Sequence, residues 1–224
     1  MTYPPGSFLD ILPPTAARRL NEIGHRRRIR RGTIVFHEGG RSRDAFVILE
    51  GRIKIATTTP DGREIVLAVR GPGDIVGELS AIDGSPRSAT GTAIDIVEAN
   101  VVPADAFVEF LGNVPGAGLV VLRLLIDRQR ESDRARVEFG AYDATRRVAR
   151  RLVELAERFG QPVGDVIRIG LPLTQEELAG WTGASREAVS KALRALRASA
   201  LVETGRRAVT VLDVEGLRRR ADGV

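Results

Sequence analysis

The 224-residue chain contains no cysteine, only two histidines and only one tryptophan. Without cysteine it has no disulfide framework, thiolate zinc site, cysteine-ligated iron–sulfur cluster or thiol nucleophile. Its longest apolar run, near residues 119–126, is interrupted by Arg123, and residues 1–10 lack the basic and apolar regions of a signal peptide. We therefore expect a cytoplasmic protein that does not enter a membrane.

The charge is unevenly distributed, although the net charge is only +5. Residues 144–224 carry 15 basic and 10 acidic side chains, whereas the two signs balance in residues 1–115 and in residues 116–143. A local excess of cations favours a polyanionic partner, because neutralising phosphates releases counterions. A solvated arginine-rich surface is the alternative. Because 32 of the 34 basic residues are arginine, an arginine at any one position says little about its partner.

The first half of the chain predicts an antiparallel barrel or sandwich. After a short amphipathic helix at Pro14–Gly24, runs rich in Val, Ile and Thr alternate with turns that contain glycine and proline. Strands spaced in this way are typical of a barrel or sandwich. The predicted strands are Thr33–His37, Ala45–Glu50, Arg52–Thr57, Glu64–Arg70 and Asp95–Val102, with a hairpin tip at Pro60-Asp61-Gly62.

Helical periodicity returns after Pro103, first in Ala104–Leu111 and then in a longer stretch from about Pro115 to Phe139. The long stretch presents an apolar seam that becomes polar toward its C-terminal end, which suits a partner helix. A surface helix packed on its own barrel would show the same periodicity. The seam consists of Leu119, Leu122, Ile126, Gln129 and Asp133, and another amphipathic helix is expected at Ala144–Phe159.

A helix-turn-helix is predicted near the C-terminus. Thr174-Gln175-Glu176-Glu177 has the capping-box pattern of a helix start, and Thr182-Gly183-Ala184 interrupts that helix after a short run. Ser185 is then a favourable N-cap for the second helix. We expect domains at 1–114 for the roll, 115–143 for the long helix and hinge, and 144–224 for the helix-turn-helix.

The outer face of the second helix carries hydrogen-bonding side chains that suit the major groove of DNA. Arginine and lysine bond guanine, and glutamate accepts from the cytosine amino group, so a carboxylate among cations favours base reading. The alternative is a helical hairpin with a solvated charged face. The residues on this face are Arg186, Glu187, Ser190, Lys191, Arg194 and Arg197. A predicted two-stranded wing follows, and Arg206-Arg207 at its tip would contact phosphates of the DNA backbone.

A second cluster has the composition of an anion-binding site. The glycine-rich segment Gly71–Ser80 enters a short helical turn, and Arg87 and Ser88 follow nearby. Backbone amides, a guanidinium and a hydroxyl suit a phosphate, while Glu78 suits a ligand that also bears a hydroxyl, such as a ribose. A Glu78–Arg87 salt bridge that braces a loop is the alternative.

These segments resemble the bacterial transcription factors of the cyclic AMP receptor protein and fumarate–nitrate reductase regulator (CRP/FNR) family. The resemblance covers nearly the whole chain. It implies an α+β fold, with an N-terminal antiparallel β-roll that binds a cyclic nucleotide, a long helix that forms a homodimer and a C-terminal winged helix-turn-helix that reads a palindromic operator. The matching segments are Gly77-Glu78-Leu79-Ser80, Arg87-Ser88-Ala89, Thr174-Gln175-Glu176-Glu177 and Gly183-Ala184-Ser185-Arg186-Glu187-Ala188-Val189.

The resemblance also implies roles for individual residues. Glu78 would bind the ribose 2′-hydroxyl, Arg87 and Ser88 the cyclic phosphate, and Ser132 and Asp133 the adenine. Cyclic AMP is the expected effector. The cyclic AMP receptor has Thr and Ser at the last two positions, so the carboxylate of Asp133 leaves cyclic GMP and no nucleotide as alternatives. The backbone of Gly77, Leu79 and Ser80 would complete the pocket, and the implied DNA-binding residues are Thr174, Ser185, Arg186, Glu187, Ser190, Lys191 and Arg206.

We expect no enzymatic activity and no cofactor; the nucleotide is an effector. The expected partners are double-stranded DNA and RNA polymerase. A metal-dependent cupin-type enzyme on the same roll remains a distant alternative. It would need a cluster of histidines, and the chain has only His25 and His37.

Overall fold

The computed structural model describes residues 3–170, 174–205 and 208–223 of the chain. They form two compact units, one comprising Met1–Thr57 and Leu67–Glu131, the other Thr58–Val66 and Ser132–Val224. We describe each unit separately. Within the described residues no single helix is long and apolar enough to cross a membrane, although α4 (Ala104–Asn113) and α5 (Ala117–Ala141) reach that length and composition together, with a 109° bend between them.

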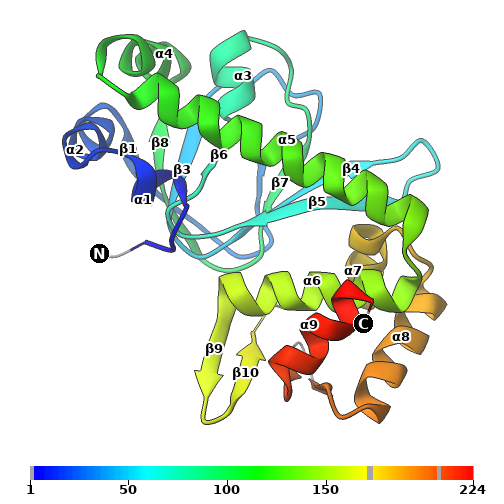
Figure 1. Cartoon of the computed structure of the whole chain (residues 1–224). Helices are drawn as coiled ribbons and strands as arrows, with labels where there is room; N and C mark the ends of the chain where they lie inside the picture. Colours follow the sequence, from blue (N-terminus) through cyan, green and yellow to red (C-terminus); the bar gives the residue numbers. More distant parts are fainter. Residues whose placement is uncertain (1–2, 171–173, 206–207, 224) are drawn as a thin grey trace. The chain divides into compact units, whose positions relative to one another are not determined.

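The first unit contains the predicted β-roll apart from residues Thr58–Val66, and the roll consists of two four-stranded sheets (Figure 1). The strand orders are β1-β8-β3-β6 and β2-β7-β4-β5. The β4–β5 hairpin turns at the predicted tip, where Gly62 has a φ of +83°. The strands are β1 (His25–Ile29), β2 (Ile34–Phe36), β3 (Ala45–Glu50), β4 (Ile53–Thr58), β5 (Glu64–Arg70), β6 (Ile75–Val76), β7 (Thr90–Ala93) and β8 (Val97–Val102).

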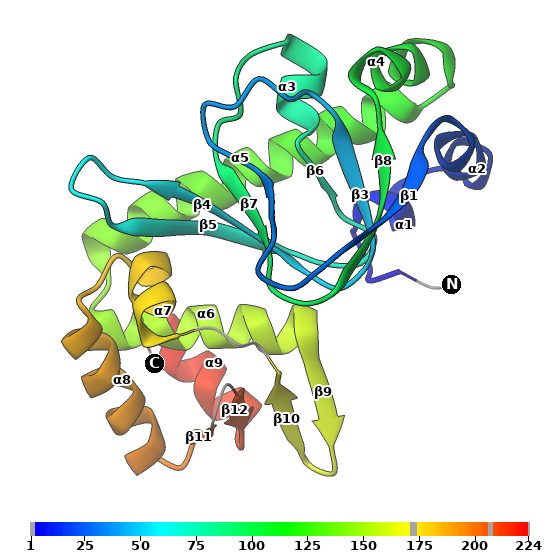
Figure 2. The same ribbon diagram turned by 180° about the vertical axis from the view of Figure 1, so that it is seen from behind.

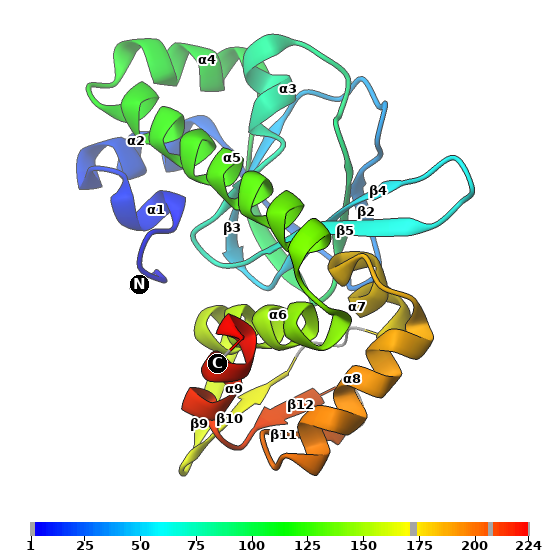
Figure 3. The same ribbon diagram turned by 45° about the vertical axis from the view of Figure 1, so that its right-hand side comes forward.

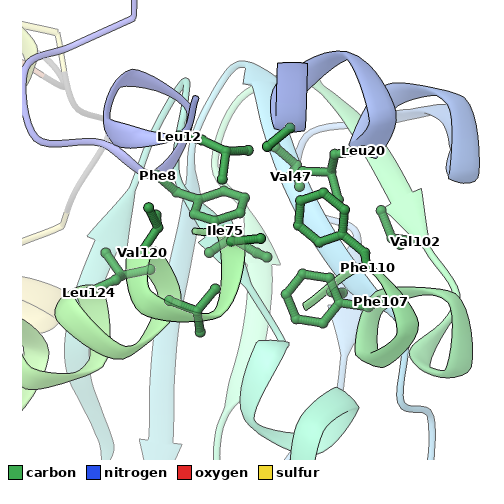
Figure 4. Packing of buried hydrophobic residues seen from close by; sticks show 14 of the residues in the cluster. Phe8, Leu12, Leu20, Val47, Ile75, Val102, Phe107, Phe110, Val120 and Leu124 are labelled. Carbon is green, nitrogen blue, oxygen red and sulfur yellow. The ribbon is translucent and has the colours of Figure 1, made fainter. Parts of the chain in front are cut away.

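Helices cover one side of the roll, so the central strand β3 is buried on both faces. Because side chains alternate along a strand, Phe46 and Ile48 point into the roll while Ala45 and Val47 face the helices. Figure 4 shows Val47 among aromatic and aliphatic side chains of these helices. The helices are α1 (Phe8–Ile11), α2 (Pro14–Ile23), α3 (Glu78–Asp83), α4 and the first part of α5.

Helix α5 has two apolar faces, whereas its sequence periodicity predicted one. The first part of α5 lies along the roll (Figure 3). Val120, Val121 and Leu124 are buried in the cluster that also holds Val47 and Ile75 of the roll, and Figure 4 shows Val120 and Leu124 in that cluster. The predicted seam lies elsewhere on the helix, where Leu119 and Leu122 are 51% and 53% exposed. The helix therefore packs on its own roll and still leaves an apolar seam exposed.

The second unit contains the helix-turn-helix and a four-stranded antiparallel sheet of order β11-β12-β10-β9. The predicted two-stranded wing, β11 and β12, is thus half of a larger sheet (Figure 2). Gly160 ends helix α6 as predicted and begins the first strand of this sheet. The elements are α6 (Ala144–Phe159), β9 (Gly160–Val163), β10 (Val166–Ile169), α7 (Gln175–Thr182), α8 (Arg186–Ala198), β11 (Val202–Gly205), β12 (Ala208–Val211) and α9 (Val214–Asp222).

Candidate functional site

Arg87 is a buried cation in the loop that follows α3. Its guanidinium donates to the carbonyls of Gly77 and Asp44, both at 2.7 Å, and to the hydroxyl of Ser42 at 3.3 Å. Burial lowers the pKa of this guanidinium, and the carboxylates of Asp44 and Glu78 oppose that shift. The groups that accept these hydrogen bonds are all neutral, so the bonds orient the guanidinium without cancelling its positive charge.

Gly77 allows this arrangement because it lacks a side chain. It precedes α3 in the left-handed conformation, with a φ of +77°. A Cβ atom on this residue would lie 2.5 Å from Nη1 of Arg87, which is too close for a real contact. The glycine of the predicted anion-binding segment is therefore required both for the turn and for the close approach of Arg87.

Glu78 is 3% exposed, and its ion-pair partner is Arg128 of α5. Nη1 of Arg128 donates to Oε1 of Glu78 at 2.6 Å, and Nη2 donates to the carbonyl of Ile75 at 2.7 Å. Burial lowers the pKa of Arg128, while Glu78 acts in the opposite direction. In place of a Glu78–Arg87 brace, the structure has an ion pair that links α3 to the long helix α5.

The sequence patterns did not identify Arg128 as part of the site. Its position was nonetheless informative, because it lies four residues after the buried Leu124 and so on the same face of α5. A cation on a face that is otherwise apolar needs a buried partner. That partner could not be identified from the sequence, since fifty positions separate Glu78 from Arg128.

The remaining predicted ligand contacts differ in exposure. Leu79 and Ser88 are exposed and Ser80 is buried, all within the first unit. Ser132 and Asp133 are exposed and belong to the second unit, where Asp133 pairs with Arg136 at 3.2 Å. The roles of these residues toward a ligand stay predictions.

The helix-turn-helix has the caps that its sequence predicts. The Thr174 hydroxyl accepts from the amide of Glu177 at 3.1 Å, and the Glu177 carboxylate accepts from the amide of Thr174 at 2.8 Å. The Ser185 hydroxyl accepts from the amide of Ala188 at 3.1 Å. Gly183, between the helices, has a φ of +59°. These features fix where α8 begins.

Helix α8 has one buried face and one exposed face, as its sequence predicts. Val189, Leu193 and Leu196 are buried together with Ala192. Arg186, Glu187 and Lys191 are exposed and Ser190 is half-buried, so the predicted base-reading groups lie on the outer surface. Arg206, the predicted phosphate contact of the wing, lies outside the described residues.

Part of the basic excess of residues 144–224 is neutralised within the second unit. Glu138 is 5% exposed and accepts from Arg150 at 2.8 Å and from Arg151 at 2.6 Å. Arg146 donates to the carbonyl of Ala221 at 3.0 Å, and Arg147 donates to the carbonyl of Thr182 at 2.7 Å; these neutral acceptors hold both guanidinium groups in place without cancelling their charge. The charge of this segment therefore overstates what a polyanion can reach, and the exposed cations of α8 are the relevant ones.

Both histidines are exposed, and they lie at different sheets of the roll. His25 is the first residue of β1, and His37 directly follows β2 of the other sheet. Among the described residues, no group of three or more His, Cys, Asp or Glu side chains is arranged to hold a metal ion.

Comparison with known proteins gives a family for each of the two segments. Residues 26–113 match the cyclic nucleotide-binding domain family, and residues 146–220 match the Crp-like helix-turn-helix domain family. The chain is 38% identical over 191 residues to a CRP-like cAMP-activated global transcriptional regulator of Mycobacterium tuberculosis, covering 85% of each chain. It is 29% identical to the cyclic AMP receptor protein of Thermus thermophilus, covering 89% of each.

A solved structure gives the same result for the fold. The crystal structure of a CRP-family transcriptional regulator from Thermus thermophilus superposes with a TM-score of 0.75 at 28% identity, covering 88% of this chain and 96% of that one. The fold prediction, a β-roll of the cyclic nucleotide-binding type followed by a C-terminal helix-turn-helix, is confirmed. The chain belongs to the CRP/FNR family of transcription factors.

Proposed function

We propose that this regulator is a homodimer that binds a palindromic operator under the control of a cyclic nucleotide, cyclic AMP in the first place. The observation that carries the proposal is the buried, charged guanidinium of Arg87, held against Gly77 within the segment that matches the cyclic nucleotide-binding domain. The relative from Mycobacterium tuberculosis is described as cAMP-activated, which supports the choice of nucleotide. In this proposal the protein is a regulator and not an enzyme, and it acts in the cytoplasm, where its operator DNA lies.

The proposed ligand contacts follow from charge and hydrogen-bonding chemistry. Arg87 and the exposed hydroxyl of Ser88 bind the cyclic phosphate, since a guanidinium forms strong charge-assisted bonds to phosphate oxygens. Glu78 accepts from the ribose 2′-hydroxyl, with the backbone of Gly77, Leu79 and Ser80 around it. Ser132 and Asp133 contact the base, and the carboxylate of Asp133 accepts from an amino group.

Arg128 supplies a route from the ligand to the long helix. It forms an ion pair with Glu78, so a ribose hydroxyl that bonds Glu78 changes the surroundings of a side chain on α5. A ligand shifts a conformational equilibrium only through a difference in affinity between two states. We propose that the exchange of partners at Glu78 provides part of that difference.

The proposed dimer uses the exposed seam of α5. Leu119, Leu122 and Ile126 are between 42% and 53% exposed, and their spacing of three and four residues places them on one face of the helix. A second copy of the same seam would bury them. Two copies of α8 then read successive major grooves, and RNA polymerase is the proposed partner of the bound dimer.

Operator binding with and without nucleotide tests the proposal. Operators would be selected from randomised duplexes, and their affinity measured alone, with cyclic AMP and with cyclic GMP. We expect a two-fold symmetric motif and tighter binding with cyclic AMP. The double variant R186A/K191A, which changes two exposed residues of α8, is expected to lose selective binding while it still binds nucleotide. Absence of a symmetric motif would contradict the proposal.

A regulator that works without nucleotide is the second candidate. It is favoured by the contacts that already satisfy the pocket, since Arg128 pairs with Glu78 and backbone carbonyls accept from Arg87. Calorimetry distinguishes the two candidates. Heat on titration with either cyclic nucleotide supports control by a nucleotide, whereas no heat at millimolar concentration supports the second candidate.

A further inference from the structure

The guanidinium of Arg87 lies over the aromatic ring of Phe36 in β2. The carbon Cζ of Arg87 is 4.7 Å from the centroid of this ring, which is within the range of a cation–π contact. Both side chains are removed from solvent, with Phe36 7% and Arg87 2% exposed. Phe36 belongs to the hydrophobic cluster inside the roll, so the core of the roll is in direct contact with the cation of the proposed phosphate site.

The neighbours of Phe36 hold its ring in this place. Phe36 is in register with Gly91 of β7, and a Cβ atom on Gly91 would lie between 2.7 and 3.0 Å from three carbons of the ring. The ring therefore occupies the space that a side chain of Gly91 would need. Phe46 of β3 packs on the ring as well, with 5.9 Å between the two centroids. Enclosed in this way, the ring offers Arg87 a fixed surface.

The backbone of Arg87 is also held in place. Its amide donates to the carbonyl of Gly40 at 2.9 Å, and its carbonyl accepts from the amide of Gly39 at 2.8 Å. Gly40 has no room for a side chain, because a Cβ atom would lie 2.8 Å from the carbonyl oxygen of His37. Both ends of the Arg87 side chain, the backbone and the guanidinium, thus have defined contacts in the roll.

An aromatic ring stabilises a buried cation without using its hydrogen-bond donors. Burying a guanidinium is costly unless its charge is compensated. A carboxylate would bind the edge of the guanidinium and compete with a phosphate for the same N–H groups, whereas a ring acts on the flat face. The bonds that the structure describes use three of the five N–H donors of Arg87, so two remain for phosphate oxygens.

We propose that Phe36 is a positioning residue for the cyclic nucleotide, because its ring holds the guanidinium of Arg87 in the orientation that binds the cyclic phosphate. This inference rests on the proposed function, in which Arg87 contacts that phosphate. Phe36 acts through Arg87 and not by contact with the nucleotide. A side chain that is ordered before the ligand arrives loses less entropy on binding, and ordering a flexible side chain on binding lowers affinity by about 2- to 10-fold.

Fluorinated phenylalanines at position 36 test the attraction between the ring and the cation. Fluorine withdraws electrons from the ring face and weakens its attraction for a cation, while the size of the ring changes little. With one, two and three fluorine atoms on Phe36, the affinity of the full-length protein for cyclic AMP should fall in steps, by about 2- to 10-fold over the series, measured by calorimetry. The matched control is the same series at Phe107, a buried residue that stacks on Phe110 in the other hydrophobic cluster, and it should leave the affinity unchanged.

A double-mutant cycle tests whether Phe36 acts through Arg87. Phe36→Leu should weaken the binding of cyclic AMP in the wild-type background but not in the background of Arg87→Gln, where the guanidinium is absent. Urea denaturation shows which variants are folded at the temperature of the titration, and the fluorinated series decides the question if Phe36→Leu does not fold. Equal losses of affinity in the two backgrounds would mean that Phe36 only supports the fold, and the inference would be wrong.

The wild type separates this inference from the proposed function. If the wild type binds cyclic AMP and the fluorinated series at Phe36 leaves the affinity unchanged, the ring does not position Arg87, while the proposed function stands. If the wild type gives no heat with cyclic AMP or cyclic GMP, control by a nucleotide is refuted and this inference with it.

Discussion

The ion pair between Glu78 and Arg128 determines what single substitutions in the pocket will do. Both partners are largely buried, so replacing one of them leaves the other as an uncompensated charge. Glu78→Gln should lower the free energy of unfolding by about 3–5 kcal/mol, measured by urea denaturation. The double variant Glu78→Gln with Arg128→Met should recover most of this loss, because no unpaired charge remains. Costs that simply add in the double variant would show that the two side chains do not act as a pair.

Glu187 tests whether α8 reads bases. It is exposed in the first turn of α8, where a carboxylate repels phosphates but accepts from a cytosine amino group. Glu187→Ala should relax base preference at one position in each half-site, by about 1–3 kcal/mol of discrimination. Selection from randomised duplexes measures this, with Glu176→Ala as the control because Glu176 is an exposed acid in the first turn of α7. An unchanged motif for Glu187→Ala would show that this residue does not contact a base.

At the level of single residues, the sequence predicted which residue types form the site better than it predicted which side chains form ion pairs. Gly77, Glu78 and Arg87 were recognisable because a glycine turn, a carboxylate and a guanidinium occur close together in the chain. The partner of Glu78 was not recognisable, because Arg128 is brought to it by the packing of α5 on the roll. Pairs between distant segments depend on tertiary structure, which short-range patterns do not contain.

Among the elements, those with local signals were predicted and those without were missed. The limits of β3, β5 and α6 agree with the prediction because apolar periodicity and end signals mark them. Strand β1 was missed because exposed side chains occupy its first four positions, and a strand at the edge of a sheet needs few apolar residues. Strand β7 was missed because its sequence, Thr-Gly-Thr-Ala, is short and contains a glycine, which is unfavourable in strands.

The N-cap of α6 gives a prediction that depends on pH. The Asp143 carboxylate accepts from the amide of Arg146 at 2.7 Å, and this hydrogen bond is the main reason why the pKa of Asp143 is lowered. Asp143→Ala should lower the free energy of unfolding by about 1 kcal/mol at neutral pH. Because the pKa of Asp143 is lower in the folded state, its charged form stabilises the folded state at every pH above the pKa of an unfolded aspartate, about 3.9. This stabilisation disappears as the pH falls through the lower pKa of the folded state.

Urea denaturation of the wild type and Asp143→Ala between pH 7 and pH 2 measures this cap. The difference between the two proteins should be constant from neutral pH down to about pH 4 and should shrink below it. Asp143→Asn is the matched control, because asparagine is an equally good N-cap but does not titrate. The difference between the Asn and Ala variants should therefore not depend on pH. If the difference in free energy of unfolding between the wild type and Asp143→Ala is equally independent of pH, the charge of Asp143 does not contribute to the cap.

The exposed seam of α5 predicts the effect of a charge on assembly. Leu122 is 53% exposed and lies away from the residues that pack on the roll, so Leu122→Glu should leave the fold intact. In a dimer it would place two buried carboxylates together, which is strongly unfavourable. Sedimentation equilibrium should show a monomer for Leu122→Glu and a dimer for the wild type. Val108→Glu is the control, because Val108 is a similarly exposed residue of α4. A dimer that persists in Leu122→Glu would mean that this seam is not the interface.

At the scale of the whole molecule, nucleotide and operator should affect each other equally. The pocket residues Glu78, Arg87 and Arg128 belong to one unit and the reading helix α8 to the other, and the chain of α5 runs from the first into the second. If the nucleotide tightens operator binding by a given factor, the operator must tighten nucleotide binding by the same factor, commonly about 5- to 150-fold. Calorimetric titration of cyclic AMP with and without saturating operator measures that factor, and operator titration with and without cyclic AMP measures it independently.

The variant Arg128→Met separates binding from this coupling. Removing the guanidinium frees Glu78 from its partner on α5, so the exchange of partners can no longer transmit ligand binding to the helix. Arg128→Met leaves Glu78 unpaired and so lowers stability as Glu78→Gln does, and we expect its folded fraction to bind cyclic AMP and operator separately, with affinities that no longer depend on each other. Arg130→Met is the matched control, because Arg130 is an exposed arginine of the same helix whose ion pair, with Asp127, is local. Equal coupling in Arg128→Met and wild type would show that α5 senses the nucleotide through other residues. Ser132 and Asp133, in the next turn of the helix, would then be the first residues to change.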